Sequence, residues 1–440
     1  MKKNHLSPLI IIVLSFLGII ILGTFILKLP FSVKEGMSVS WIDAFFTATS
    51  AICVTGLSTI PDISITFSIF GKIVIAFLIH VGGLGIVTVA MYILMILGIK
   101  ISVMERYVIK ESMNQNSIQG MVKLVKKIIM TAFAIETIGL ILNFIVFIQD
   151  YPFWQALGIS AFHTISSFNN AGFDILGATS LAAYSGNVLL NISTMLMIFL
   201  GGIGFIVIFD VFKKHKWSEL TIYTRAVIKL SLLLIIVGTL VIKLTNYETV
   251  TWLEAIFHSV STRTAGFSTI NIGSLSIPAL AMIMALMFVG ASPNSTGGGI
   301  KTTTFYTMFH STINFLRGKT PVVNKKKIDD ETRLKAFTLA GMSVMMIFVV
   351  FIILATVEAG NPDIENHFQA LLFETISAFG TVGLSTGITP FLTSGSKIVI
   401  MILMFVGRLG PITIFGIFNR NWGHPNVSSV EYAPAKILIG

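Results

Sequence analysis

The sequence predicts an all-α membrane protein built from four repeats, each consisting of a helix, a reentrant loop and a second helix. Two observations lead to this prediction. First, 54% of the 440 residues are hydrophobic and 11% are charged, which is too apolar for a soluble protein of this length. Second, one segment recurs, an apolar helix-like run that ends in a short polar stretch around a glycine. Its four copies are Phe46 to Ser58, Phe162 to Asp174, Phe257 to Ser268 and Phe373 to Ser385.

Apolar runs between these copies supply the helices, since a helix that crosses a bilayer needs about 20 apolar residues. Two weaker runs, Ala226 to Leu244 and Ile277 to Val289 with its continuation, join six strong runs to make eight expected spans. The strong runs are Leu9 to Leu27, Ile73 to Leu97, Ile128 to Ile148, Val188 to Phe209, Phe337 to Val357 and Ile398 to Phe418. We place the repeats at residues 1–110, 111–220, 221–325 and 326–440, the last with a C-terminal tail.

Basic residues indicate the orientation of the chain. They gather in Lys2 and Lys3, Lys100 to Lys127, Lys213 to Arg225 and Arg317 to Lys335, which an eight-span topology places on one side. The positive-inside rule makes that side cytoplasmic, with both termini inside a multi-pass plasma-membrane protein. The net charge of +10 therefore follows from topology and does not indicate nucleic-acid binding.

The recurring segments are too short to cross the bilayer, so each is expected to enter and return. A half-helix that enters from outside points its partially negative C-terminal end at the membrane centre, where a dehydrated cation needs stabilisation. The backbone carbonyls that follow can replace the hydration shell of an ion. Four copies therefore predict a pseudo-four-fold pore. Close helix packing is the usual role of a lone membrane glycine, but four at the same place favour a filter. They are Gly56, Gly172, Gly266 and Gly383.

The four glycine segments resemble the potassium filter of the Ktr/Trk/HKT superfamily of potassium transporters, and the resemblance extends over nearly the whole chain. It is strongest to the membrane subunits of bacterial Ktr systems. In that family a glycine in the first segment accompanies potassium selectivity and a serine occurs in some sodium-preferring members, so Gly56 implies potassium. The resemblance implies a K+ site at the carbonyls of Val54, Thr55, Gly56, Asn170, Ala171, Gly172, Thr264, Ala265, Gly266, Thr381, Val382 and Gly383.

The same resemblance implies potassium uptake, a homodimer with the C-terminus near Gly440 at the interface, and a cytosolic nucleotide-binding regulatory ring of KtrA or KtrC type. This chain has no nucleotide-binding domain of its own, and its basic cytoplasmic loops offer a docking surface. We expect no cofactor in this chain, with K+ as the transported ion and Na+ either activating or coupled. A sodium-coupled symporter and a less selective cation channel remain alternatives. Scattered histidines and the lack of HExxH or GxSxG motifs argue against an enzyme.

The third repeat departs from the pattern at residues 290–304. Pro293 and a glycine triplet cannot continue a helix, and a break at membrane depth must line water or be buried in protein. We expect an intramembrane gate loop, with an ordinary cytoplasmic turn as the alternative. A phosphate-binding loop is a weaker alternative than the turn, because glycine and lysine lack the required spacing. The expected gate residues are Gly290, Pro293, Asn294, Ser295, Thr296, Gly297, Gly298, Gly299, Lys301 and Arg408.

Two arginines interrupt apolar surroundings. An arginine at mid-membrane costs about 2.5 to 3.5 kcal/mol on insertion scales, so a functional or paired role is expected. We expect Arg408 to reach the gate loop near Asn294, Ser295 and Thr296, with snorkelling to the interface as the alternative. Arg263 is expected to point behind the filter toward a partner such as Glu374.

Other polar positions near the glycines have milder expectations. His163 and His258 are expected to be packing residues with one hydrogen bond. Asn169 and Asn170 either brace the second loop or coordinate the ion. A second set of glycines, at Gly82 to Gly85, Gly201 to Gly204, Gly290 and Gly407 to Gly410, is expected to provide close packing or room for a bend.

Overall fold

The computed structural model describes residues 7–113, 117–323, 326–364 and 366–418. The basic Lys2 and Lys3 and the tail that ends at Gly440 lie outside these residues. The described chain is almost entirely helical, so the expectation of an all-α membrane protein is confirmed. A pair of two-residue strands, β1 (Val322–Val323) and β2 (Lys326–Lys327), forms an antiparallel turn that the sequence did not predict.

Within the described residues, four helices of 21 to 28 residues are long and apolar enough to cross a membrane. Their outward faces expose large apolar side chains such as Leu22 and Phe348, as expected for surfaces that contact lipid. These helices are α1 (Pro8–Lys28), α7 (Met121–Phe147), α11 (Ile222–Thr245) and α15 (Asp330–Val357).

Each long helix is followed by a helix of 10 to 16 residues, too short to span. Local signals define their starts. Ser40 caps the first by accepting a hydrogen bond from the Asp43 backbone, and Thr251 forms a capping box with Glu254, which satisfies free N–H groups of the first turn. The four short helices are α2 (Trp41–Cys53), α8 (Phe153–Phe168), α12 (Trp252–Ser261) and α16 (His367–Gly380).

The third helix of each repeat is broken, which corrects the expectation of continuous spans over Ile73 to Leu97, Val188 to Phe209 and Ile398 to Phe418. The broken pairs bend by 99°, 96° and 96°. They are α4 (Ile69–Leu84) with α5 (Ile86–Ile96), α9 (Val188–Ile203) with α10 (Phe205–Lys214), and α17 (Ser394–Leu409) with α18 (Pro411–Phe418). In the third repeat α13 (Ile277–Phe288) and α14 (Thr302–Leu316) are separated by a loop.

The second set of glycines serves both expected purposes. The last glycine of each set makes the break, with positive φ at Gly85, Gly204 and Gly410. The first glycine packs against a short helix, because a Cβ there would lie about 2 Å from a backbone carbonyl oxygen. Those distances are 2.1 Å from Gly82 to Ile52, 1.9 Å from Gly201 to Phe168 and 2.0 Å from Gly407 to Phe379.

The remaining elements are small. They are α3 (Ile63–Thr66), α6 (Val103–Ser112) and 3-10 turns at Pro30–Ser32, Ala182–Tyr184, Trp217–Glu219, Ile272–Ser274 and Thr389–Phe391.

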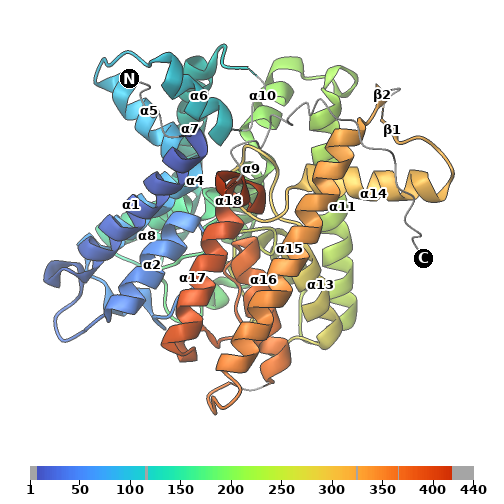
Figure 1. The fold of residues 1–440 in the computed structure, drawn as a ribbon. Coiled ribbons are helices and arrows are strands. Elements are labelled where there is room, and N and C mark those ends of the chain that lie inside the picture. The colour runs from blue at the N-terminus through green and yellow to red at the C-terminus, as the bar shows by residue number, and fades with distance from the viewer. Residues whose placement is uncertain (1–6, 114–116, 324–325, 365, 419–440) are drawn as a thin grey trace.

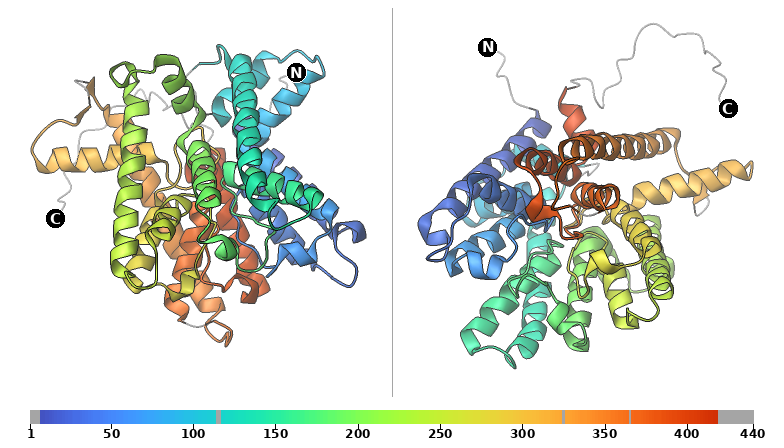
Figure 2. Two further views of the ribbon diagram at one scale, coloured as in Figure 1. Left: turned by 180° about the vertical axis from the view of Figure 1, so that it is seen from behind. Right: turned by 90° about the horizontal axis from the view of Figure 1, so that it is seen from below.

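The repeats close into a ring. The third helix of each repeat packs against the short helix of the next, in the pairs α4 with α8, α9 with α12, α13 with α16, and α17 back onto α2. Figure 2 shows this arrangement from below, with the four groups disposed around one centre. In Figure 1, α14 extends sideways from the body, and the four short helices lie in the half of the molecule away from α5, α6 and α10.

Candidate ion-conduction site

The four glycine segments, residues 54–56, 170–172, 264–266 and 381–383, share one backbone conformation. The first residue of each adopts positive φ, at Val54 (56°), Asn170 (57°), Thr264 (84°) and Thr381 (49°), and so does each glycine, with values from 69° to 92°. The residue between them does not adopt positive φ. Alternation between positive and negative φ turns successive carbonyl groups toward the same side of the segment, which is how a backbone presents oxygens to an ion.

These segments form a closed ring. Each glycine lies so close to the next repeat that a Cβ on it would meet a carbonyl oxygen, that of the residue preceding the next glycine. The four contacts are Gly56 with Ala171 at 2.3 Å, Gly172 with Ala265 at 2.3 Å, Gly266 with Val382 at 2.1 Å and Gly383 with Thr55 at 2.1 Å. The order therefore runs once through the repeats and returns to the first. Any side chain at these positions would displace the neighbouring glycine segment.

A serine in each short helix braces the segment, and sequence reasoning missed all four. Its carbonyl accepts a hydrogen bond from the residue before the glycine, at 2.8 to 2.9 Å. The hydroxyl groups of Ser50 and Ser377 also accept from the glycine N–H, both at 3.1 Å. The signal was present, because a phenylalanine stands four residues before the serine in every copy. The serines are Ser50, Ser166, Ser261 and Ser377.

Asn169, just before the second glycine segment, and Asn170, its first residue, are both buried and hydrogen-bonded to neighbouring side chains. The Asn170 amide lies 3.0 Å from Thr264 Oγ1. Asn169 donates to Glu136 Oε1 at 3.1 Å and to the Ile165 carbonyl at 2.8 Å. These contacts brace the segment from its side, the first of the two expected roles.

The loop between α13 and α14 is buried directly against the ring, with Ala291, Ser292 and Thr296 at most 1% exposed. Thr296 Oγ1 donates to the Phe168 carbonyl at 3.1 Å, at the end of α8. A Cβ on Gly297 would lie 2.1 Å from Thr264 Oγ1, and one on Gly298 would lie 2.3 Å from Thr381 Oγ1. The loop therefore covers the end of the ring where the short helices finish.

Further bonds tie the loop to the broken helix of the second repeat and to itself. The backbone N–H of Ser292 donates to the Gly202 carbonyl at 3.0 Å, and the backbone N–H of Phe205 donates to the Asn294 carbonyl at 2.9 Å. Lys301 Nζ closes the loop by donating to the Gly297 carbonyl at 2.8 Å.

The other expected loop residues lie in the same network. Tyr223 donates to the Pro293 carbonyl at 3.0 Å, and Ser295 donates to the Ser292 carbonyl at 2.5 Å. Gly290 packs against the Gly298 carbonyl, and Gly299 has a φ of 68°.

Arg408 lies where the loop, the first repeat and the fourth repeat meet. Its guanidinium donates to the Thr296 carbonyl, to the Gly82 carbonyl and, at 3.1 Å, to the Gly83 carbonyl. Within its glycine set Arg408 occupies the position of Gly83 and Gly202. Of the three loop residues expected near it, Thr296 is the one that accepts its hydrogen bond.

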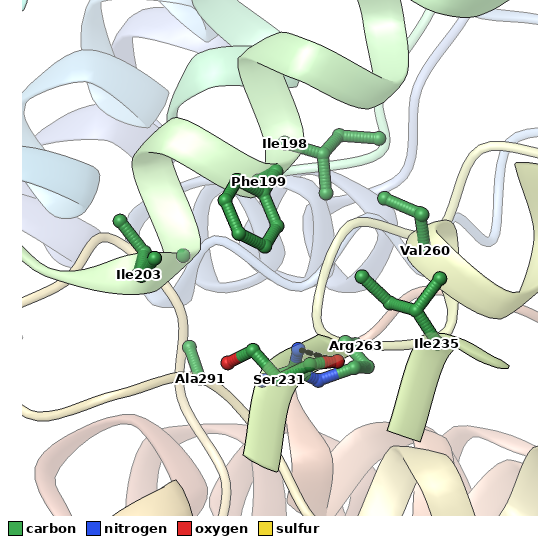
Figure 3. A pocket seen from close by; sticks show the side chains of 9 residues that line it. Ile198, Phe199, Ile203, Ser231, Ile235, Val260, Arg263 and Ala291 are labelled. Carbon is green, nitrogen blue, oxygen red and sulfur yellow. Dashed lines mark hydrogen bonds between the residues drawn. The ribbon is translucent and has the colours of Figure 1, made fainter. Parts of the chain in front are cut away.

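Arg263 does not meet Glu374, so that expected pairing is wrong. Its guanidinium donates to the Ser231 carbonyl at 3.4 Å, and its Nε has no hydrogen-bond partner among the residues that the structure describes. Figure 3 shows it beside a small cavity between α9, α11 and the loop, together with Phe199 and Ala291. Glu374 instead accepts a hydrogen bond from Thr389.

His163 on α8 and His258 on α12 are buried and hydrogen-bonded. His163 contacts Thr194 Oγ1 at 2.8 Å, and His258 contacts the Glu254 carbonyl at 2.9 Å and Ser268 Oγ at 3.1 Å. In the described part of the chain, no three His, Cys, Asp or Glu side chains lie close enough to hold a metal ion.

Comparison with known proteins agrees with this geometry. A family model described as TrkH, cation transport protein, matches residues 8–426. The Ktr system potassium uptake protein B of Bacillus subtilis is 36% identical, and the alignment covers 100% of this chain and 98% of that protein. The potassium/sodium uptake protein NtpJ of Enterococcus hirae is 35% identical, with coverage of 100% and 98%. The crystal structure of the potassium transporter TrkH from Vibrio parahaemolyticus matches with a TM-score of 0.73 at 19% identity, covering 96% of this chain and 87% of that one. The chain therefore belongs to the TrkH family of cation transport proteins and is a transporter, not an enzyme.

Proposed function

We propose that this protein takes up potassium across the plasma membrane through the ring formed by its four glycine segments. The observation that supports this most strongly is the closure of the ring, in which every glycine abuts the carbonyl that precedes the next glycine. Four such segments surround an ion with backbone oxygens and compensate for lost hydration. The relatives named as potassium uptake proteins support the choice of ion.

Selectivity for potassium rests on the backbone of the ring. Gly56 has a φ of 92°, and a side chain there would collide with the Ala171 carbonyl oxygen. A serine at this position must therefore displace the second segment and change the size of the oxygen cage. Such a change alters the match between the cage and a particular cation.

Gating is assigned to the loop between α13 and α14. Because Thr296, Gly297 and Gly298 lie against the end of the ring, ions leaving the filter must pass this loop. Its many backbone hydrogen bonds hold it in place, and Arg408 adds a charged donor. Opening requires these bonds to break together, so we assign to Arg408 the role of holding the loop closed.

Regulation is assigned to partners outside this chain. We place both termini in the cytoplasm and propose a homodimer that binds a cytosolic nucleotide-binding ring of KtrA or KtrC type. Basic side chains on α6, α10 and the segment after α14 offer a surface for an acidic partner. They include Arg106, Lys110, Lys213, Lys214 and Lys319.

A second candidate is transport that also involves sodium, either coupled or through a less selective pore. The name of the 35% identical relative from Enterococcus hirae, potassium/sodium uptake protein, favours it. The two functions differ in ion dependence, since coupled transport moves sodium at a fixed ratio and a channel requires only a gradient.

The test is K+ and Na+ flux into proteoliposomes that contain the purified chain, compared with Gly56→Ser. We expect potassium flux that exceeds sodium flux, and a lower ratio of the two in the variant. An unchanged ratio in the variant would remove the filter assignment of the first segment. Should the wild type move neither ion, the experiment is repeated with the cytosolic ring added, and continued absence of flux would contradict uptake by this protein.

A further inference from the structure

The residue just before each glycine segment differs among the repeats, although the backbone that follows it is the same. These residues are Cys53, Asn169, Arg263 and Gly380. Among the described residues, Asn169 is the one of the four whose side chain hydrogen-bonds to a carboxyl group, that of Glu136. The second segment is therefore linked to a carboxyl group behind it, whereas Arg263, before the third segment, reaches a backbone carbonyl of α11.

The side chain of Asn169 is fully enclosed. Besides Glu136, its amide nitrogen donates to the Ile165 carbonyl at 2.8 Å. On its other side it packs against α4, where a Cβ on Gly83 would lie 2.2 Å from Asn169 Oδ1. The next residue in the chain is Asn170, the first of the glycine segment. Any shift of Asn169 is thus passed directly to that backbone.

Glu136 occupies an unusual position for a carboxyl group. It lies on α7, one of the spanning helices, and is 9% exposed. A carboxyl group inside a spanning segment is costly and marks a functional site by default. Its Oε1 atom lies 3.2 Å from His80 Nδ1 on α4. Glu136 thereby connects the first repeat, through His80, with the second segment, through Asn169.

We propose that Glu136 is a positioning residue for potassium selectivity, which it controls by holding Asn169 and the second segment against the first repeat. This inference rests on the proposed function of the ring. The first two repeats meet where Gly56 lies against the Ala171 carbonyl, and Glu136 stabilises this contact by holding the second segment in place. Loss of the carboxyl group frees the second segment to move away from the first and widens the oxygen cage on one side.

The test compares K+ and Na+ flux in proteoliposomes for Glu136→Leu and Glu136→Gln. Leucine removes the acceptor of Asn169, and we expect the ratio of K+ to Na+ flux to fall about fivefold, the size of one buried hydrogen bond. Glutamine keeps an acceptor oxygen, so its ratio should stay within about twofold of the wild type. Asn169→Ala, which leaves Glu136 and His80 together, should lower the ratio as Glu136→Leu does, and the double variant should show no further loss.

The matched control is Asn143→Leu on the same helix. Asn143 donates to Thr164 Oγ1 at 2.9 Å and accepts from Ser193 at 2.7 Å, and within the described chain neither of these bonds reaches a glycine segment. We expect this variant to lose thermal stability and keep the wild-type flux ratio. An equal loss of selectivity in Asn143→Leu, or a wild-type ratio in both Glu136→Leu and Asn169→Ala, would overturn the positioning role.

Gly172→Ala separates this inference from the proposed function. If Gly172→Ala abolishes potassium flux or lowers the flux ratio, while Glu136→Leu keeps the wild-type ratio, the ring selects ions and Glu136 does not position it. If Gly172→Ala leaves the ratio unchanged, the ring itself is not the filter and both proposals fail. If the Glu136→Leu protein does not accumulate in the membrane, Asn169→Ala is measured in its place. A lowered flux ratio then supports the positioning role, and a wild-type ratio contradicts it.

Discussion

Arg408 donates a hydrogen bond to the carbonyl of Thr296 across 112 residues of sequence. Through this contact the fourth repeat holds the loop of the third, and the same guanidinium reaches Gly82 and Gly83 in the first. Thr296 in turn donates to Phe168 in the second repeat. All four repeats therefore take part in holding the loop against the ring: Arg408 of the fourth donates to the first and the third, and Thr296 of the third donates to the second.

Arg408→Ala is expected to raise cation flux about tenfold, because hydrogen bonds to a charged donor contribute about 1.5 to 3 kcal/mol to the closed arrangement. Flux is measured in proteoliposomes after detergent thermal melts have verified folding. Arg408→Lys is the control, since a lysine keeps the charge and cannot serve both carbonyl groups with a planar fork. It should show an intermediate flux. Wild-type flux in a folded Arg408→Ala protein would contradict the gating role.

Gly383→Ala is expected to abolish potassium flux, because φ is 92° and the new Cβ would lie 2.1 Å from the Thr55 carbonyl oxygen. Gly387→Ala in the same repeat is the matched control. Its φ of 99° imposes similar backbone strain, but no atom lies within 4 Å of its Cβ. It should lose stability and still conduct. Equal flux in the two variants would show that the ring contact has no role in conduction.

Gly201→Ala is expected to lower the melting temperature in detergent, since the new Cβ would lie 1.9 Å from the Phe168 carbonyl oxygen. Overpacking of this kind costs about 1 to 3 kcal/mol. Gly158→Ala on α8 has open space at its Cβ and should stabilise the helix by about 0.5 to 1 kcal/mol. A Gly201→Ala protein as stable as the wild type would mean that α9 can retreat from α8 without loss.

Glu358 predicts a pH dependence at the end of α15, beyond its apolar span. Burial alone would raise the pKa of this carboxyl group, but hydrogen bonds from Ser396, Asn361 and Thr393 outweigh it and hold the pKa below its ordinary value of 4.5. A carboxyl group with a lowered folded-state pKa stabilises the protein above the unfolded-state pKa. This stability is lost as the pH falls through the folded-state pKa.

We therefore expect thermal melts to show a smaller loss of stability on acidification below pH 4.5 in Glu358→Gln than in the wild type. The variant should also be less stable near neutral pH, because the amide replaces a carboxylate that accepts three hydrogen bonds from Asn361 and Thr393. Parallel pH profiles for the two proteins would remove Glu358 as the source of the dependence.

Sequence reasoning found the four glycine segments because their pattern is local. Each copy carries its own apolar run, its own glycine and its own polar residues, so repetition alone revealed them. The same reasoning missed Ser50 and Ser377, whose role depends on a carbonyl and a hydroxyl that face the following turn. The repeated spacing from phenylalanine to serine was visible, but its meaning required the backbone conformation.

The sequence by itself determined the membrane setting, the helical class, the four-fold repetition and the break in the third repeat, because composition, periodicity and helix-breaking residues act over short distances along the chain. Tertiary structure alone decided how sharply the helices bend at Gly85, Gly204 and Gly410, the position of the loop against the ring and the partners of the buried charges. Arg408 donates to backbone carbonyls in the first repeat and the loop, and Arg263 donates to Ser231 and does not meet Glu374. Glu136 lies beside His80 and accepts from Asn169. A buried charge interacts with whatever donors and acceptors the fold brings within about 3 Å, and residues that distant in sequence meet only when the ring has closed.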